Sequence, residues 1–128
     1  MVLKPLHTGI TVNNMKDALE WYEKNLGFRL VEERRPEGMH VHICFVQNGD
    51  FQLELFEHDN GQPLPDYRKT LPGDLQVVGT KHIAFGVADL IALKEQFIAN
   101  GVEIANDMSP NVLFIRDNSG VLLEFNQL

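Results

Sequence analysis

The chain carries the same order of segments twice, and this internal duplication constrains its fold more than any other feature. Each half reads as a strand, a helix and three further strands, with a His in the first strand and a Glu in the last. The interval between His7 and His82 is close to that between Glu54 and Glu124. Matched intervals of this kind are the signature of a repeated unit. We therefore expect two modules of the order βαβββ, an α+β fold.

The first half carries clear local signals. Alternation of apolar and polar residues predicts a strand at 6–12, and an apolar stripe of helical spacing predicts a helix at 15–25. Asn13-Asn14 offers an N-cap and Gly27 is placed to end the helix. Asn48-Gly49 is a strong hairpin signal. Three strands are expected after the helix, at 28–34, 39–47 and 50–57.

The second half repeats these signals. Asp89 is the expected N-cap of a helix that Asn100-Gly101 closes. Strands are expected at 81–87, 102–106, 112–116 and 121–126, with a turn at 117–120. The order of elements is thus the same in both halves.

A length of 128 residues is enough for one ordinary domain. We expect a single domain over 1–128, made of a first module at about 4–58 and a second at about 80–128. The segment between them, about 59–79, is rich in Pro and Gly and reads as a linker. A loop of this length is also able to cover a site.

The four strands that carry His or Glu can each be sorted into two faces, because alternate side chains point to opposite sides. The bulky residues of each strand fall on one face, which should pack beneath the helices. The other face carries the His or Glu together with smaller or polar neighbours: His7 with Gly9 and Thr11, His82 with Ala84 and Gly86, Glu54 with Gln52 and Phe56, and Glu124 with Leu122 and Asn126. Glycine and alanine beside the histidines are expected to leave empty volume above them.

Two imidazoles and two carboxylates on such faces form a ligand set for a divalent transition metal. A carboxylate among apolar strand residues is costly to bury unpaired, which favours a cation nearby. A single His or Glu in a strand is more often hydrogen-bonded or exposed, and only the matched positions in both modules favour a shared site. We therefore predict a metal site made of His7, Glu54, His82 and Glu124, with two coordination positions left for water or substrate oxygens.

The chain resembles the vicinal oxygen chelate superfamily along almost its whole length. The motifs that carry the resemblance are His7-Thr8-Gly9-Ile10, Ala18-Leu19-Glu20-Trp21-Tyr22, Asn25-Leu26-Gly27-Phe28, Leu53-Glu54-Leu55-Phe56, His82-Ile83-Ala84-Phe85 and Gly120-Val121-Leu122-Leu123-Glu124-Phe125. The resemblance implies tandem βαβββ modules that form an open, incomplete barrel around a metal, often in a homodimer. Within the superfamily, His-Glu-His-Glu is the ligand pattern of bacterial-type glyoxalase I. Methylmalonyl-CoA epimerases typically carry Gln at the position of Glu54, and extradiol dioxygenases and fosfomycin-resistance enzymes carry His there.

The resemblance thus implies a lactoylglutathione lyase-like metalloenzyme. Such an enzyme isomerises the hemithioacetal of a 2-oxoaldehyde and a thiol, glutathione or another, through a metal-bound enediolate. Glu124 is the expected base, with Glu54 as the second carboxylate. Ni or Zn is the expected metal, ahead of Fe, Co or Mn. The alternatives are another metal-dependent reaction, such as epimerisation or Fe(II) dioxygenation, and a metal-free protein that binds a drug or metabolite.

The charge balance narrows the class of partner. Eleven Lys and Arg against eighteen Asp and Glu give a net charge of −7, and no basic run interrupts it. Nucleic acids and anionic membranes are therefore poor partners, which leaves a small-molecule substrate and a second copy of the chain. No segment has the apolar length of a signal peptide or a membrane span, so we expect a cytoplasmic protein. A lone cysteine, Cys44, agrees with this and reads as a small buried hydrophobe.

His40, His42 and Cys44 alternate on one face of the expected strand at 39–47 and resemble a second metal site. If the hairpin loop has two residues, Cys44 pairs with Leu53 and the histidines point toward the helix or the edge. One more residue in the loop would turn the histidines toward Glu54. We favour a role other than metal binding for these three residues. Three basic residues able to meet the carboxylate or phosphate of a thiol cofactor read as ordinary solvated charges: Arg34, Arg35 and Lys69.

Overall fold

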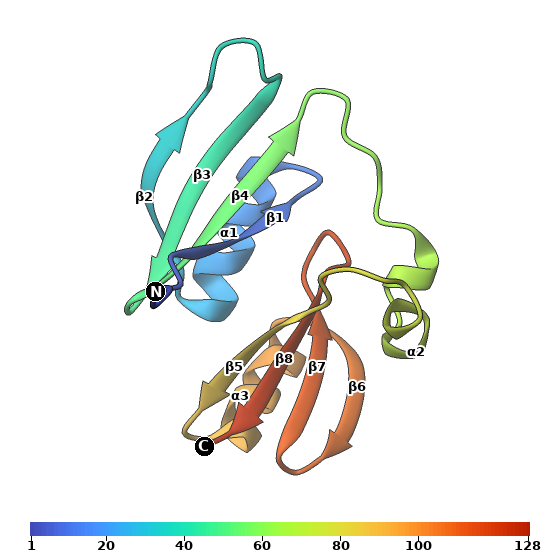
Figure 1. The fold of residues 1–128 in the computed structure, drawn as a ribbon. Coiled ribbons are helices and arrows are strands. Elements are labelled where there is room, and N and C mark those ends of the chain that lie inside the picture. Colours follow the sequence, from blue (N-terminus) through green and yellow to red (C-terminus); the bar gives the residue numbers. More distant parts are fainter. The chain divides into compact units, whose positions relative to one another are not determined.

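Each half of the chain folds into its own four-stranded sheet with one long helix on one face (Figure 1). The computed structural model describes all residues, 1–128, and divides them into two units, Met1–Pro63 and Leu64–Leu128. The strand orders are β1-β4-β3-β2 and β5-β8-β7-β6, so the two sheets have the same topology and neither closes on itself. This confirms the α+β class and the repeated βαβββ order.

The strands and the two long helices of the two units follow one another as expected. The first unit contains β1 (His7–Thr11), α1 (Met15–Leu26), β2 (Arg29–Arg34), β3 (Val41–Asn48) and β4 (Phe51–His58). The second unit contains η1 (Asp66–Arg68), α2 (Leu71–Leu75), β5 (Ile83–Val87), α3 (Leu90–Ala99), β6 (Glu103–Ser109), β7 (Val112–Arg116) and β8 (Leu122–Gln127). No helix among them is long and apolar enough to cross a membrane.

The ends of the two long helices follow the sequence signals. The Asn14 side chain accepts a hydrogen bond from the amide of Asp17 at the start of α1, and the Asp89 side chain accepts one from Ala92 at the start of α3. Gly27 follows α1 in the left-handed conformation, with φ 68°. That conformation is one that glycine adopts without the steric cost other residues incur.

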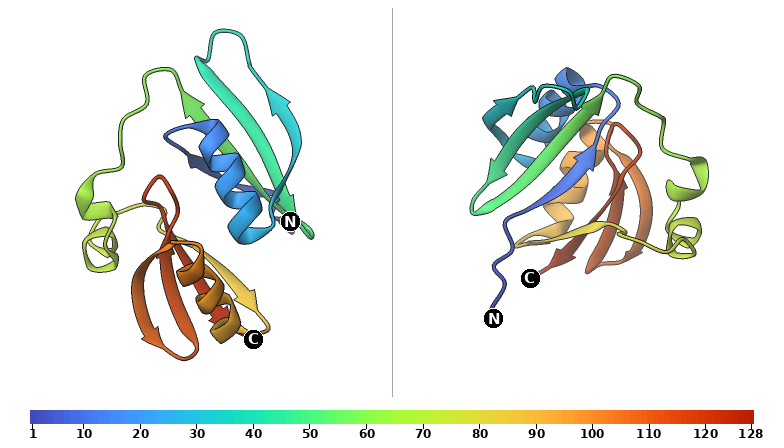
Figure 2. Two further views of the ribbon diagram at one scale, coloured as in Figure 1. Left: turned by 180° about the vertical axis from the view of Figure 1, so that it is seen from behind. Right: turned by 45° about the horizontal axis from the view of Figure 1, so that its top comes forward.

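Each long helix covers one face of its own sheet, as the left view of Figure 2 shows from behind. The side chains buried between helix and sheet are apolar. Leu53 and Leu55 of β4 are fully buried in the first unit, as is Tyr22 of α1. In the second unit Phe97 of α3 packs edge-on against Phe125 of β8, with ring centroids 5.2 Å apart. The helix-covered faces are therefore the cores of the two units, and the opposite faces carry the polar residues singled out above.

The β3–β4 hairpin has the expected loop length but a different register. Asn48 pairs with Phe51, so the loop is Gly49-Asp50 and not Asn48-Gly49, and Cys44 pairs with Leu55 and not with Leu53. The turn itself explains the change, since Gly49 at the first loop position has a positive φ of 57°, as a type II′ turn requires there. The Asn48 side chain donates a hydrogen bond to the carbonyl of Leu26 at the end of α1. Each β3 residue thus pairs two residues further along β4 than expected. A shift by two residues leaves every side chain on its expected face.

The segment between the modules contains helical structure that the sequence did not suggest. It forms η1 and α2, and the Thr70 side chain caps α2 by accepting a hydrogen bond from Gly73. Leu71 of α2 packs against Phe114 and Leu122, on the face of the second sheet that also carries Glu124. This part of the segment thus belongs to the second unit and covers part of its polar face.

Candidate functional site

In the first unit, the parallel pairing of β1 and β4 brings His7 and Glu54 together. Gly9 lies opposite Glu54 in the register, and His7 is two residues away on the same face. The Nε2 atom of His7 is 2.9 Å from Oε2 of Glu54. The side chains are only partly exposed, 35% for His7 and 17% for Glu54, so they are accessible to a small ligand.

The second unit builds an equivalent pair from β5 and β8. Ala84 lies opposite Glu124, and His82, which directly precedes β5, places its Nε2 atom 2.7 Å from Oε2 of Glu124. Glu124 has a further partner, because the side-chain amide of Asn126 donates a hydrogen bond to its Oε1 atom at 3.1 Å. The Nδ1 atom of His82 is buried without a hydrogen-bond partner. Each predicted His thus meets the Glu of its own module.

A phenylalanine supports each histidine, and the sequence analysis missed both. Phe45 lies opposite Glu54 and Phe114 opposite Glu124 in the two registers. The His7 ring stands edge-on to Phe45 with centroids 5.4 Å apart, and the His82 ring stands edge-on to Phe114 at 4.9 Å. Edge-to-face contacts of this kind restrict the orientation of a ring. Only the strand register could have revealed them.

A second repeated contact ties each helix to the last strand of its module. The carboxylate of Glu57 accepts a hydrogen bond from the amide of Met15 at the start of α1. The side-chain oxygen of Gln127 accepts the equivalent bond from Leu90 at the start of α3. The signal was present in the sequence, since each of these residues follows the Glu of its pair by the same interval.

The volume expected above the glycines is filled. A Cβ atom at Gly9 would lie 3.0 Å from the Phe56 ring, and one at Gly86 would overlap the side chain of Leu128. The expectation of empty space beside the histidines was therefore wrong. The two glycines instead accommodate the neighbouring side chains of Phe56 and Leu128.

The two pairs fit the requirements of a divalent metal. Neighbouring ligands of a six-coordinate ion with bonds of about 2.1 Å lie roughly 3 Å apart. The separations of Nε2 and Oε2, 2.9 Å and 2.7 Å, are close to this value. Each pair therefore offers one imidazole nitrogen and one carboxylate oxygen that need little movement to bind a cation.

The basic residues considered above have local partners. Arg34 forms an ion pair with Glu32, which lowers the pKa of that carboxyl, and its guanidinium lies 5.2 Å from the centroid of the Phe45 ring. Arg35 lies near His42, and Lys69 pairs with Asp66. Arg34 is thus placed beside the aromatic support of His7, nearer to the candidate site than the sequence indicated.

The cysteine and its two neighbouring histidines do not share one environment. His40 precedes β3 with a left-handed φ of 58° and lies beside Asp59, so it is not on the strand face with the other two. His42 and Cys44 are on the helix-covered face, opposite to that of Glu54, because Phe45 is the residue that pairs with Glu54. Burial raises the pKa of the Cys44 thiol, which argues against a nucleophile at neutral pH.

Comparison with known proteins gives a consistent result. A family model described as the Glyoxalase/Bleomycin resistance protein/Dioxygenase superfamily matches residues 4–125. The chain is 34% identical over 133 residues to uncharacterized protein YqjC of Bacillus subtilis (strain 168), which covers 92% of this chain and 87% of that protein.

Two solved structures illustrate the similarity of fold. The trypanothione-dependent glyoxalase I of Leishmania major matches with a TM-score of 0.80 and 21% identity, over 98% of this chain and 87% of that chain. The fosfomycin resistance protein FosX of Mesorhizobium loti matches with a TM-score of 0.72 and 16% identity, over 98% of this chain and 92% of that chain. At these identities the similarity concerns the fold.

Proposed function

This chain belongs to the Glyoxalase/Bleomycin resistance protein/Dioxygenase superfamily, and from that premise we propose that it is a metal-dependent lyase of the glyoxalase I type. Its substrate would be a small molecule with adjacent oxygens, the hemithioacetal of a 2-oxoaldehyde with glutathione or another thiol. We further propose that it works in the cytoplasm as a homodimer.

One observation carries the proposal. Each module places a His and a Glu within hydrogen-bonding distance, the His at or just before its first strand and the Glu on the parallel last strand, at equivalent positions of the register. The phenylalanine behind each His and the cap on each helix are repeated too. Two such pairs supply two nitrogens and two oxygens, which suit Ni, Zn, Fe, Co or Mn. The four proposed ligands are His7, Glu54, His82 and Glu124.

The chemistry needs charge stabilisation and a base. A divalent metal, when bound, acts as a Lewis acid toward the adjacent oxygens of the substrate. The carboxylate of Glu124 takes the proton from one substrate carbon and returns it to the neighbouring carbon. This transfer exchanges the oxidation levels of the two adjacent carbons, so the reaction needs no redox cofactor. Glu54 is the second carboxylate, and the two histidines hold the ligand set in place.

The decisive test is elemental analysis followed by an assay. We expect the purified protein to contain a divalent metal, and the protein reconstituted separately with Ni and Zn to convert methylglyoxal plus glutathione to the thioester. Affinity for nitrogen and oxygen ligands favours these two metals over Mn and Fe. Absence of turnover with both metals would exclude the glyoxalase reaction.

The same measurements separate the rival activities. Iron together with oxygen consumption would indicate a dioxygenase, for which two His and one carboxylate suffice and one Glu is surplus. Failure to bind any divalent metal would indicate a small-molecule binding protein. Light scattering on the purified chain tests the homodimer.

A further inference from the structure

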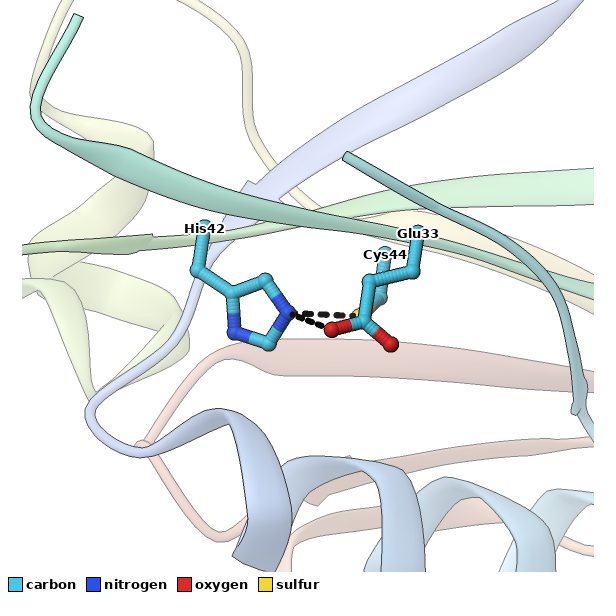
Figure 3. Close-up of side chains that lie close together, drawn as sticks. All are labelled: Glu33, His42 and Cys44. Carbon is cyan, nitrogen blue, oxygen red and sulfur yellow. Dashed lines mark hydrogen bonds and ion pairs between the residues drawn. The ribbon is translucent and has the colours of Figure 1, made fainter. Parts of the chain in front are cut away.

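A second cluster of metal-ligating side chains lies on the helix-covered face of the first sheet. Glu33 of β2 pairs with Cys44 of β3, and His42 is two residues from Cys44, so all three side chains converge (Figure 3). The Nε2 atom of His42 is 2.9 Å from Oε1 of Glu33 and 3.5 Å from Sγ of Cys44. The three ligand atoms all lie within 4.8 Å of one another.

The separation between the His42 nitrogen and the Cys44 sulfur matches tetrahedral zinc. With a Zn–S bond of about 2.3 Å and a Zn–N bond of about 2.0 Å, the two ligand atoms lie roughly 3.5 Å apart. The separation of Sγ and Nε2 is 3.5 Å. The corresponding distance for a nitrogen and a carboxylate oxygen is about 3.3 Å, which the exposed Glu33 side chain can reach by a small rotation.

The three side chains of the cluster differ in how far they are exposed to solvent. Cys44 is fully buried, the His42 side chain is 13% exposed and the Glu33 side chain is 50% exposed. An ion can therefore approach from the Glu33 side, where water would complete the coordination. A thiolate among the ligands favours zinc over the hard cations Mg and Ca.

The cluster is not required by the fold, because the second module lacks it. Asp107 pairs with Leu113 there, as Glu33 pairs with Cys44, and Asn111 stands where His42 stands. Asp107 forms an ion pair with Lys94. The second module thus builds the same sheet without a nitrogen or sulfur ligand at these positions.

We propose that Glu33, His42 and Cys44 bind Zn²⁺ as a clamp that ties β2 to β3. β2 is the edge strand of its sheet, is exposed along its length and has an irregular register between Leu30 and Glu32. Zinc bonds to the Cys44 thiolate, to Nε2 of His42 and to a Glu33 oxygen. The thiol proton passes to solvent, and the His42 proton moves from Nε2, where it faces Glu33, to Nδ1, so the ring stays neutral.

Arg35 opposes this site. Its guanidinium lies 3.4 Å from Nδ1 of His42 and 4.0 Å from Oε1 of Glu33. It places a positive charge beside the zinc position and competes with a proton on Nδ1. Replacement of Arg35 by Gln is expected to tighten zinc binding severalfold.

Cobalt titration of the full, reduced, metal-stripped chain tests the proposal. Cys44 is the only cysteine, so a thiolate-to-cobalt charge-transfer band reports on this cluster and cannot arise from the His–Glu pairs. We expect this band together with the visible bands of tetrahedral cobalt, and we expect zinc in excess of both proposed sites to abolish the charge-transfer band. Absence of the charge-transfer band in the folded protein would overturn the proposal.

Variants identify the ligands. The Cys44→Ser change should remove the band, and His42→Gln or Glu33→Gln should weaken cobalt binding at least about tenfold. His40→Gln is the matched control, because His40 lies beside Asp59, and should bind cobalt as the wild type does. Circular dichroism verifies that each variant is folded, and an unchanged cobalt affinity in His42→Gln would refute the assignment.

Amide exchange tests the clamp itself. Zinc should slow hydrogen exchange of the β2 amides in the wild type and leave it unchanged in Cys44→Ser. Zinc that binds without slowing exchange in β2 would contradict the structural role.

Discussion

The two carboxylates of the proposed active site differ in how they are held. Glu124 is contacted at both oxygens, by His82 and by Asn126, whereas the hydrogen bonds and ion pairs of Glu54 involve His7 alone. A carboxylate held at both oxygens keeps its orientation toward a bound substrate. This fixed orientation agrees with the assignment of Glu124 as the base and makes the two glutamates a matched pair for mutation.

The Glu124→Gln variant should remain folded and bind metal but lose about 10²-fold to 10⁴-fold in kcat, the usual contribution of a general base. Glu54→Gln should chiefly weaken metal binding and recover part of its activity at high metal concentration. Steady-state kinetics with metal analysis of both variants provides the measurement. Full activity of Glu124→Gln would remove this residue from the base role.

Cys44 makes the stability of the protein depend on pH in the alkaline range. Burial raises the pKa of its thiol above the ordinary 9.0, so the folded state holds this proton more tightly than the unfolded chain. The resulting stabilisation is complete below the unfolded pKa and is lost as the pH rises through the folded one. In metal-stripped protein, the excess stability of the wild type over Cys44→Ala should shrink above about pH 9. Urea unfolding at several pH values measures it, and a constant difference would contradict the prediction.

The short helix α2 stabilises the second unit through one buried side chain. Leu71 is 9% exposed and packs against Phe114 and Leu122, whereas Leu75 of the same helix is 58% exposed. Leu71→Ala should lower the free energy of unfolding by about 2–3 kcal/mol, the lower part of the range for buried leucines. Leu75→Ala, the control, should change it by less than about 0.5 kcal/mol. Urea unfolding measures both changes, and an effect of Leu71→Ala as small as that expected for Leu75→Ala would show that Leu71 does not stabilise the unit by packing.

Most elements could be predicted because their sequence signals are local. The helix α2 and the hairpin register could not be predicted from such signals. Alternation and helix caps located the strands and both long helices. Pro72 and Gly73 read as loop residues, but Pro is tolerated in the first turn of a helix, and a side chain at Gly73 would overlap the Tyr67 carbonyl. The hairpin takes Gly49 as its first loop residue, with a positive φ, and not as its second, so the Asn48-Gly49 signal located the turn one residue too early.

The pairing of each His with its Glu is foreseeable in part. Repetition indicated which residues matter, but their partners depend on cross-strand register. Phe45 and Phe114 are phenylalanines with no distinguishing motif until β3 and β7 are paired with β4 and β8. The same limit applies to Glu33, which joins His42 and Cys44 only through the pairing of β2 with β3.

At the scale of the whole molecule, metal binding should raise the free energy of unfolding. A ligand that binds the folded state alone stabilises it by about 2.7 kcal/mol at a concentration one hundred times its Kd. Dialysis against a chelator should therefore lower the Tm, and Ni or Zn should restore it. In a chain with all four proposed ligands replaced by Ala and Cys44 by Ser, the metal-dependent change should vanish. A change that persists in this variant would place the metal elsewhere.

The caps that join each helix to its last strand differ between the two modules. Glu57 holds the start of α1 with a carboxylate, whereas Gln127 holds the start of α3 with an amide. The amide of Gln127 makes the equivalent hydrogen bond without a charge, so Glu57→Gln should keep the bond to Met15 and leave amide exchange in α1 nearly unchanged, whereas Glu57→Ala should speed it. Two halves that share one architecture can thus anchor equivalent helices with side chains of different charge.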